Sequence, residues 1–150
     1  MAEDIRVRCD AIEKCYEFML AYAGQGLTGE EGSASSGEVR ANLQRAADAI
    51  SGLAEAYAAA VKQQKLEFAE RYSAFLGVLE RDARDSLAAI QLVLAQPTIS
   101  SQLIDNLNAS IHLRALLTDL FLIDEILKPQ RTLAQAVNHR LIGGKKTGPS

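Results

Sequence analysis

The first 23 residues carry apolar and charged positions at the spacing of a helix. The charged residues Glu3, Arg6, Asp10, Glu13 and Glu17 line one side. The apolar side chains recur three or four positions apart on the other, at Ile5, Cys9, Ile12, Tyr16, Met19 and Ala23, with Ala11, Cys15, Phe18 and Tyr22 widening the stripe. Such spacing separates the two sets onto opposite faces. The pattern predicts an amphipathic helix over residues 3–23.

A segment rich in glycine and serine follows, GQGLTGEEGSASSG, residues 24–37. This composition buries too little apolar surface to offset the entropy lost on ordering, so we expect a mobile loop. Glycines can also cradle a phosphate, but no Gly-Lys-Ser or Gly-Lys-Thr follows them and two glutamates lie among them. The loop therefore does not indicate a nucleotide site.

Residues 38–96 contain no proline and two isolated glycines, Gly52 and Gly77. Apolar content drops at KQQK, residues 62–65, between one stripe (Val39, Leu43, Ala46, Ile50, Leu53, Tyr57, Val61) and the next (Phe68, Tyr72, Phe75, Leu79, Ala83, Leu87, Ile90, Leu94). Because helices usually run about 8–20 residues, we expect a turn near residues 62–65 that joins two antiparallel helices. These four residues are good helix formers without turn chemistry. A single long helix supported by a partner chain is the alternative.

Prolines mark the boundaries of the last third of the chain. Pro97 ends the preceding helix, and Thr98 or Ser100 can cap the next one. That helix is predicted over residues 99–128, ending at Pro129. A short helix, RTLAQAVNHRLI, and a disordered tail follow. We therefore expect an all-α antiparallel four-helix bundle over residues 1–128, with a short C-terminal helix and a basic tail over residues 129–150.

The predicted helix over residues 99–128 carries a polar stripe. Asp105, His112 and Asp119 are seven residues apart, which places them within roughly 40° of one another around a straight helix. They form a possible polar site. Adjacent members would be about 10 Å apart along the axis, which is too far to share one metal ion.

The apolar face of the same helix switches near residues 110–113. Either a local kink or a change of neighbour, such as a second subunit, explains such a switch. The segment after His112 is apolar on several sides, which indicates burial on more than one side. We therefore expect a homodimer whose face is formed by Leu113, Leu116, Leu117, Leu120, Ile123 and Leu127.

Three functional readings of His112 compete with a purely structural one. A di-metal bundle needs Glu-x-x-His, but Ala109 and Ala136 stand three residues before His112 and His139. The stretch HLRALL is similar in outline to the His-x-Leu-Lys-Gly pattern of histidine phosphotransfer domains, yet Arg114, Ala115 and Leu116 replace its last three residues. The third reading is an axial ligand to haem or another group. A hydrogen-bonded histidine at a helix surface or at a helix interface is the simplest interpretation, and no cofactor is expected.

Composition and charge narrow the class of protein. The 150 residues suit one domain, with 48% hydrophobic and 23% charged residues. Cys9 and Cys15 lie roughly 240° apart on one helix, so we expect core thiols and no disulfide between them. Neither a signal peptide nor a membrane span is evident, which favours a cytoplasmic protein.

The net charge of −3 hides an asymmetry between the two ends of the chain. Residues 129–150 carry four cations and no acid, so residues 1–128 balance at −7. An acidic body disfavours nucleic-acid binding. The motifs of common hydrolases, zinc proteases and nucleotide-binding enzymes are absent from the sequence. We therefore expect a non-enzymatic interaction module, an adaptor, assembly factor or regulator of a protein partner, with a ligand or phosphoryl site at His112 as the alternative.

Overall fold

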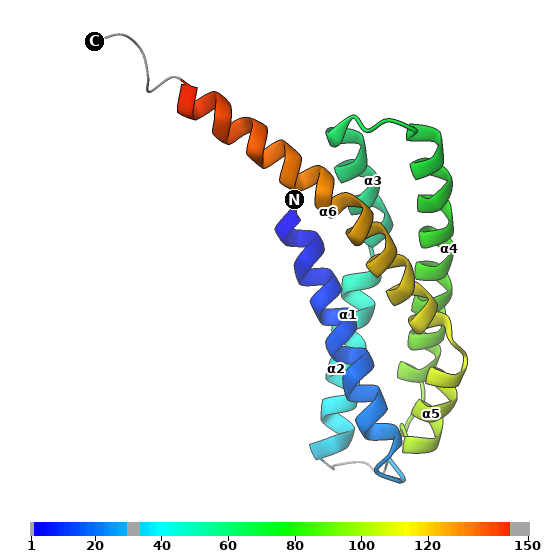
Figure 1. Cartoon of the computed structure of the whole chain (residues 1–150). Coiled ribbons are helices and arrows are strands. Elements are labelled where there is room, and N and C mark those ends of the chain that lie inside the picture. Colours follow the sequence, from blue (N-terminus) through cyan, green and yellow to red (C-terminus); the bar gives the residue numbers. More distant parts are fainter. Residues whose placement is uncertain (1, 30–33, 145–150) are drawn as a thin grey trace. The chain divides into compact units, whose positions relative to one another are not determined.

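The protein is all-α, as predicted. The computed structural model describes the backbone of residues 2–29 and 34–144, and side chains up to residue 128. Within these ranges there are six helices and no strand (Figure 1). Their bounds are α1 Ala2–Ala23, α2 Ala34–Ile50, α3 Leu53–Gln64, α4 Ala69–Leu94, α5 Ser101–Ala109 and α6 His112–Gly144.

The chain divides into two compact units, Met1–Thr118 and Asp119–Ser150. In the first unit, α1 packs against α2, α3 and α5, and α4 packs against the same three helices. Helices α2 and α3 follow one another along α4, and α4 runs back in the opposite direction (Figure 1). The predicted boundary at residue 128 differs from this division.

Helix α1 forms as predicted, and its buried face is centred slightly differently. The fully or almost fully buried side chains are Ile5, Cys9, Ile12, Cys15, Met19 and Tyr22. Tyr16 and Ala23, which we placed in the centre of the stripe, are only half-buried. Both sets have helical spacing, so packing against α2, α3 and α5 decides between them.

The segment predicted as a mobile loop is structured at both ends. Residues 34–37 already belong to α2, so the loop is shorter than expected. At its start, the Leu27 amide donates to Ser101 Oγ (2.8 Å) and the Ser101 amide donates to the Leu27 carbonyl (2.9 Å). Gly29 is buried against the backbone of Ile99, with a φ of 81°. Amino-acid composition does not predict these long-range contacts. Residues 30–33, in the middle of the predicted loop, lie outside the described residues.

The turn expected near residues 62–65 is confirmed, at residues 65–68 between α3 and α4. A further break at Ser51 and Gly52 separates α2 from α3. Gly52 has a φ of 83°, a left-handed conformation that glycine adopts readily. The sequence showed this glycine as isolated, without indicating that the helix breaks there.

The helix predicted over residues 99–128 is two helices. Ser100, one of the two predicted capping residues, caps α5. Its hydroxyl oxygen accepts a hydrogen bond from the Leu103 amide (3.1 Å). Ile111 then breaks the helix with a φ of 64°. This break explains why the apolar face switches near residues 110–113.

Pro129 does not end the last helix, contrary to the prediction, because α6 continues to Gly144. Proline removes one backbone donor from a helix and disfavours its interior, but a helix can continue through it with a kink. The expected separate short helix is therefore part of α6. The basic tail at residues 145–150 lies outside the described residues.

Candidate functional site

The three residues of the predicted polar stripe do not share one straight helix. Asp105 is exposed on α5, and His112 is exposed at the first position of α6. The left-handed Ile111 lies between them, so a constant 100° per residue does not apply across it. Asp119 is half-buried and belongs to the second unit. The geometric basis for grouping the three residues is therefore lost.

The six residues of the predicted dimer face are all buried. Leu113, Leu116 and Leu117 have exposed fractions of 4% or less in the first unit, and Leu120, Ile123 and Leu127 are equally buried at the start of the second. Their side chains are not displayed on the surface of this structure. The homodimer itself stays a prediction.

A different set of apolar side chains on α6 is exposed. Phe121, Leu122 and Ile126 are 55%, 50% and 43% exposed, and we call them the α6 apolar patch. Around the helix, the exposed Glu125 falls between Phe121 and Leu122. The sequence shows this segment as apolar on several sides, but it does not distinguish the buried side from the exposed one.

A cleft of about 300 Å³ lies between α2 and α4 in the first unit. On one side the lining comprises Gln44, Ala47 and Asp48 of α2 and Ser51, which directly follows that helix. On the other side it comprises Gln91 and Leu94 of α4 and the C-cap residue Ala95. The Gln44 amide donates to Asp48 Oδ1 at 2.9 Å. The lining has one carboxylate and no histidine or cysteine, and its polar side chains offer hydrogen bonds to a ligand.

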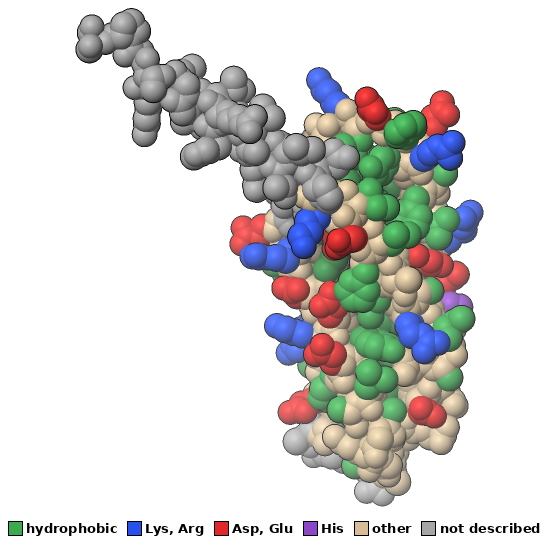
Figure 2. All heavy atoms as spheres, in the orientation of Figure 1, with side chains coloured by type: hydrophobic (Ala, Val, Ile, Leu, Met, Phe, Trp, Pro, Cys, Tyr) green, Lys and Arg blue, Asp and Glu red, His purple; other side chains and the backbone are tan. Residues whose placement is uncertain are grey.

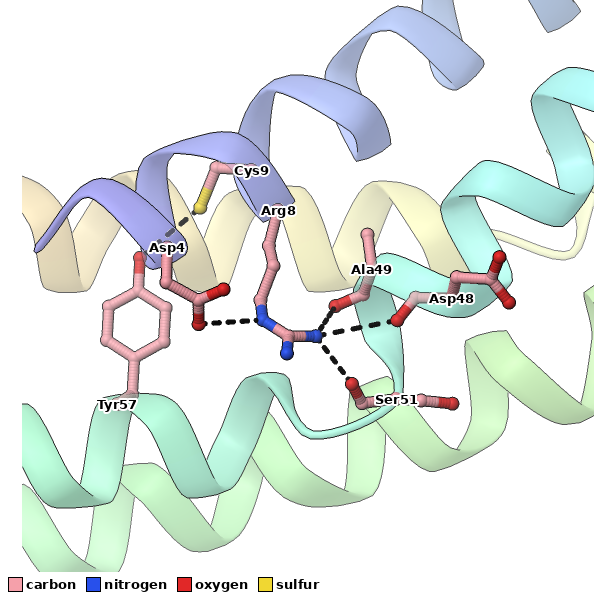
Figure 3. A network of polar contacts seen from close by, with 7 residues as sticks. All are labelled: Asp4, Arg8, Cys9, Asp48, Ala49, Ser51 and Tyr57. Carbon is pink, nitrogen blue, oxygen red and sulfur yellow. Dashed lines mark hydrogen bonds and ion pairs between the residues drawn. The ribbon is translucent and has the colours of Figure 1, made fainter. Parts of the chain in front are cut away.

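Arg8 on α1 makes several hydrogen bonds to carbonyls at the end of α2 and one to its own helix. Its Nη1 donates to the carbonyls of Asp48 (3.4 Å), Ala49 (3.0 Å) and Ser51 (2.6 Å), and its Nε donates to Asp4 Oδ2 (3.0 Å) (Figure 3). The carbonyls at a helix C-terminus lack partners within the helix and carry partial negative charge. Arg8 therefore satisfies the end of α2 from a neighbouring helix.

Arg40 on α2 does the same for the end of α4. It donates to the carbonyls of Leu94 (3.1 Å), Gln96 (2.6 Å) and Pro97 (3.0 Å). Nearby, the Tyr22 hydroxyl donates to the Ile99 carbonyl. Neither arginine could be singled out from the sequence, because each binds carbonyls 40 or more positions away. The roles of Arg8 and Arg40 are structural.

Two buried side chains have shifted pKa values. Burial raises the pKa of Cys15 to about 12. Burial also raises the pKa of Tyr22, although the nearby Arg40 opposes that shift. The Cys9 sulfur lies 3.4 Å from the Tyr57 hydroxyl, and both residues are buried (Figure 3). The prediction that both cysteines are core residues is confirmed, and the raised pKa makes Cys15 a poor nucleophile at neutral pH.

Charged side chains are dispersed over the surface. Figure 2 shows acidic and basic side chains interspersed on the face in view, with exposed hydrophobic side chains among them. Among the side chains that the structure describes, no three of His, Cys, Asp and Glu gather closely enough to hold a metal ion. In the part of the chain that the structure describes, every helix is too short or too polar to cross a membrane.

Comparisons with known protein families, with curated proteins and with solved structures gave no match.

Proposed function

We propose that this chain is a non-enzymatic helical interaction module, an adaptor, assembly factor or regulator that binds a partner protein and forms a homodimer. The single observation that carries the proposal is the α6 apolar patch. Three large apolar side chains, Phe121, Leu122 and Ile126, are about half exposed within six residues of one helix. Clustered exposed apolar residues of this kind mark interaction surfaces.

The patch also indicates the chemistry of the partner. Phe121 and Leu122 offer apolar area on a preformed helix, which suits a groove or a second helix. Glu125 lies between them and is exposed. Burying a carboxylate without a counter-charge is costly. We therefore expect the partner surface to be apolar, with a basic or hydrogen-bonding group that faces Glu125.

Substitutions in the patch test this proposal. Leu122→Asp places a charge in the patch without filling a core position, since Leu122 is 50% exposed. The matched control is Leu92→Asp on α4, where the native leucine is 67% exposed. We expect a polypeptide that co-purifies with the native chain and with Leu92→Asp, and that is lost with Leu122→Asp. The same co-purifying set with all three proteins would contradict the proposal.

The originally expected interface residues do not provide this test. Leu116 and Leu120 are almost fully buried, so an aspartate at either position would bury an unpaired charge and destabilise the fold. Loss of binding in such a variant would not distinguish an interface from an unfolded chain.

The finer architecture also belongs to this proposal. In the first unit, successive helices reverse direction from α1 to α2 and from α3 to α4, which supports an antiparallel four-helix bundle (Figure 1). In this bundle α2 and α3 together form one leg, interrupted at Gly52.

A ligand or phosphoryl site at His112 is the second candidate. The exposure of its side chain favours it, because a phosphoacceptor must be reached by the donor. His112→Ala would abolish labelling by a phosphoryl donor such as acetyl phosphate if this function is correct. Unchanged labelling in that variant would contradict it.

A further inference from the structure

The turn between α3 and α4 has an unfavourable backbone for its sequence. Lys65 and Phe68 have φ values of 48° and 60°, in the left-handed region that glycine tolerates best. For a residue other than glycine, the left-handed conformation is less populated than the right-handed one by roughly ten-fold or more. Phe68 is also 71% exposed, so little packing of its side chain offsets the cost.

Neither helix end at this turn has a strong cap. The Lys65 amide donates to the Lys62 carbonyl at 3.4 Å, a long hydrogen bond. At the other side, the N-cap position of α4 is Phe68, whose side chain makes no capping hydrogen bond. The residues between, Leu66 and Glu67, form helices well. The local sequence therefore favours a helix over this turn.

The tip of the α3–α4 hairpin is weakly packed. No side chain from residue 58 to residue 78 is buried. The nearest buried residues are Tyr57 on α3 and Leu79 on α4. Segments with few buried contacts open at low free-energy cost. The two arms can therefore separate at the tip with little loss of buried surface.

The buried faces of the two helices are in phase across the turn. Counted at about 100° per residue, the buried positions of both arms would lie within one sector of about 120° if residues 53–94 formed one helix. These positions are Leu53, Tyr57, Leu79, Ala83, Ser86, Ile90 and Val93. One continuous helix would therefore have a single buried stripe.

The α5–α6 break shows that such phasing is not automatic. By the same count, Ile104 of α5 and Leu113 of α6 would lie about 180° apart on a continuous helix. Both are buried, so joining α5 to α6 would expose one of them. The break at Ile111 is thus required by the buried pattern, whereas the turn at residues 65–68 is not.

We infer that residues 65–68 form a hinge at which α3 and α4 can join into one helix, so that two copies of the chain exchange α4 together with the helices that follow it. This inference rests on the homodimer in the proposed function, and names how the second copy binds. Each contact between α4 and α2 reforms between chains, because the second copy has an identical α2. The Arg40 bonds to the Leu94 and Gln96 carbonyls are among these contacts. Strained hinge turns favour this kind of exchange.

Two double variants at the hinge test the inference. Lys65→Gly with Phe68→Gly relieves the left-handed conformation and weakens the continuous helix. The matched control, Lys65→Ala with Phe68→Ala, removes the same side chains. Alanine favours the helical conformation at both positions. We expect the glycine pair to raise the dimer dissociation constant at least about 100-fold above that of the alanine pair.

Spin labels distinguish an exchanged dimer from any other dimer. Ala59→Cys and Ala74→Cys place labels at exposed positions equally far from the turn, while the native cysteines are buried. When the labelled protein is diluted with unlabelled protein, most labelled chains pair with an unlabelled chain. The measured distance between labels is then the distance within one chain. In a continuous helix it is about 22 Å. Across the packed hairpin it is close to the interaxial distance of about 10 Å.

Each outcome at millimolar concentration decides between the proposals. A dimer with the long intrachain distance, weakened by the glycine pair, supports the hinge. A dimer with only the short distance overturns the hinge and leaves the proposed homodimer intact. Equal dissociation constants for the two pairs also overturn the hinge. A monomer for the native chain and the alanine pair overturns both the hinge and the homodimer.

Discussion

At the scale of single residues, two arginines bind backbone carbonyls at the ends of helices from a neighbouring helix. Arg8 and Arg40 each donate to three carbonyls, at the C-termini of α2 and α4 respectively. Guanidinium groups suit this role because they present several donors in a fixed plane. A sequence alone does not reveal such caps, since the arginine and the carbonyls are far apart in the chain.

Replacing Arg8 should destabilise the protein. Hydrogen bonds from charged groups contribute about 1.5–3 kcal/mol, so we expect Arg8→Ala to lower the free energy of unfolding by about 2 kcal/mol. The control is Arg6→Ala, which removes only an exposed ion pair with Glu3 at 3.8 Å and should cost less than about 0.5 kcal/mol. Urea unfolding measures both values. Equal effects of the two substitutions would contradict the capping role.

The buried thiol of Cys15 should make stability fall at alkaline pH. Its pKa is about 12 in the folded chain, against 9.0 for an ordinary thiol. Above pH 9 the unfolded chain loses this proton while the folded chain keeps it, so the folded state becomes less favoured as pH rises. The expected contribution is up to about 1.4 kcal/mol per pH unit between pH 9 and 12. Cys15→Ala should show a shallower fall in urea unfolding over that range, and an identical slope would refute this assignment.

At the scale of elements, periodicity predicted helices well and their interruptions less well. The α1 helix and the turn after α3 agree with the sequence analysis, because the apolar stripe and its break are local signals. The breaks at Gly52 and Ile111 depend on contacts between distant helices. Ile111 shows this most clearly, since a β-branched residue at a φ of 64° contradicts local preference. Only the switch of the apolar face gave a sign of it.

The contact of Gly29 with the α4–α5 connection is a second feature that composition could not predict. A Cβ at Gly29 would lie 2.5 Å from the Ile99 carbonyl carbon, whereas a Cβ at Gly26 would meet nothing within 4 Å. Both glycines have positive φ. We expect Gly26→Ala to cost about 1 kcal/mol, and Gly29→Ala about 3 kcal/mol. Thermal unfolding of the two variants compares them, and equal losses would argue against this packing.

The candidate site was less predictable than the fold. The stripe of Asp105, His112 and Asp119 relied on a straight helix, which Ile111 interrupts. The predicted dimer face was correctly recognised as apolar, but all six residues are buried. Periodicity identifies apolar positions and does not tell which of them a chain covers by itself. Phe121, Leu122 and Ile126 are therefore distinguished only by their exposure.

At the scale of the whole molecule, the central claim is that the chain works by binding other polypeptides. The first unit has a buried apolar core and two helix ends whose carbonyls are bound by arginines. Two features do not contribute to this core, namely the exposed α6 apolar patch and the turn at residues 65–68 with its left-handed backbone. We propose that the patch binds a partner protein and that the turn allows two copies to exchange α4 together with the helices that follow it.

Native mass spectrometry of the protein purified gently from its own source tests this claim most directly, because it records oligomer mass, bound small molecules and co-purifying chains together. We expect species at twice the 16.2 kDa mass of one chain, and complexes with a second polypeptide. A single 16.2 kDa chain without any polypeptide partner would contradict the account. A stoichiometric small molecule on that single chain would instead favour a ligand site such as the one considered at His112.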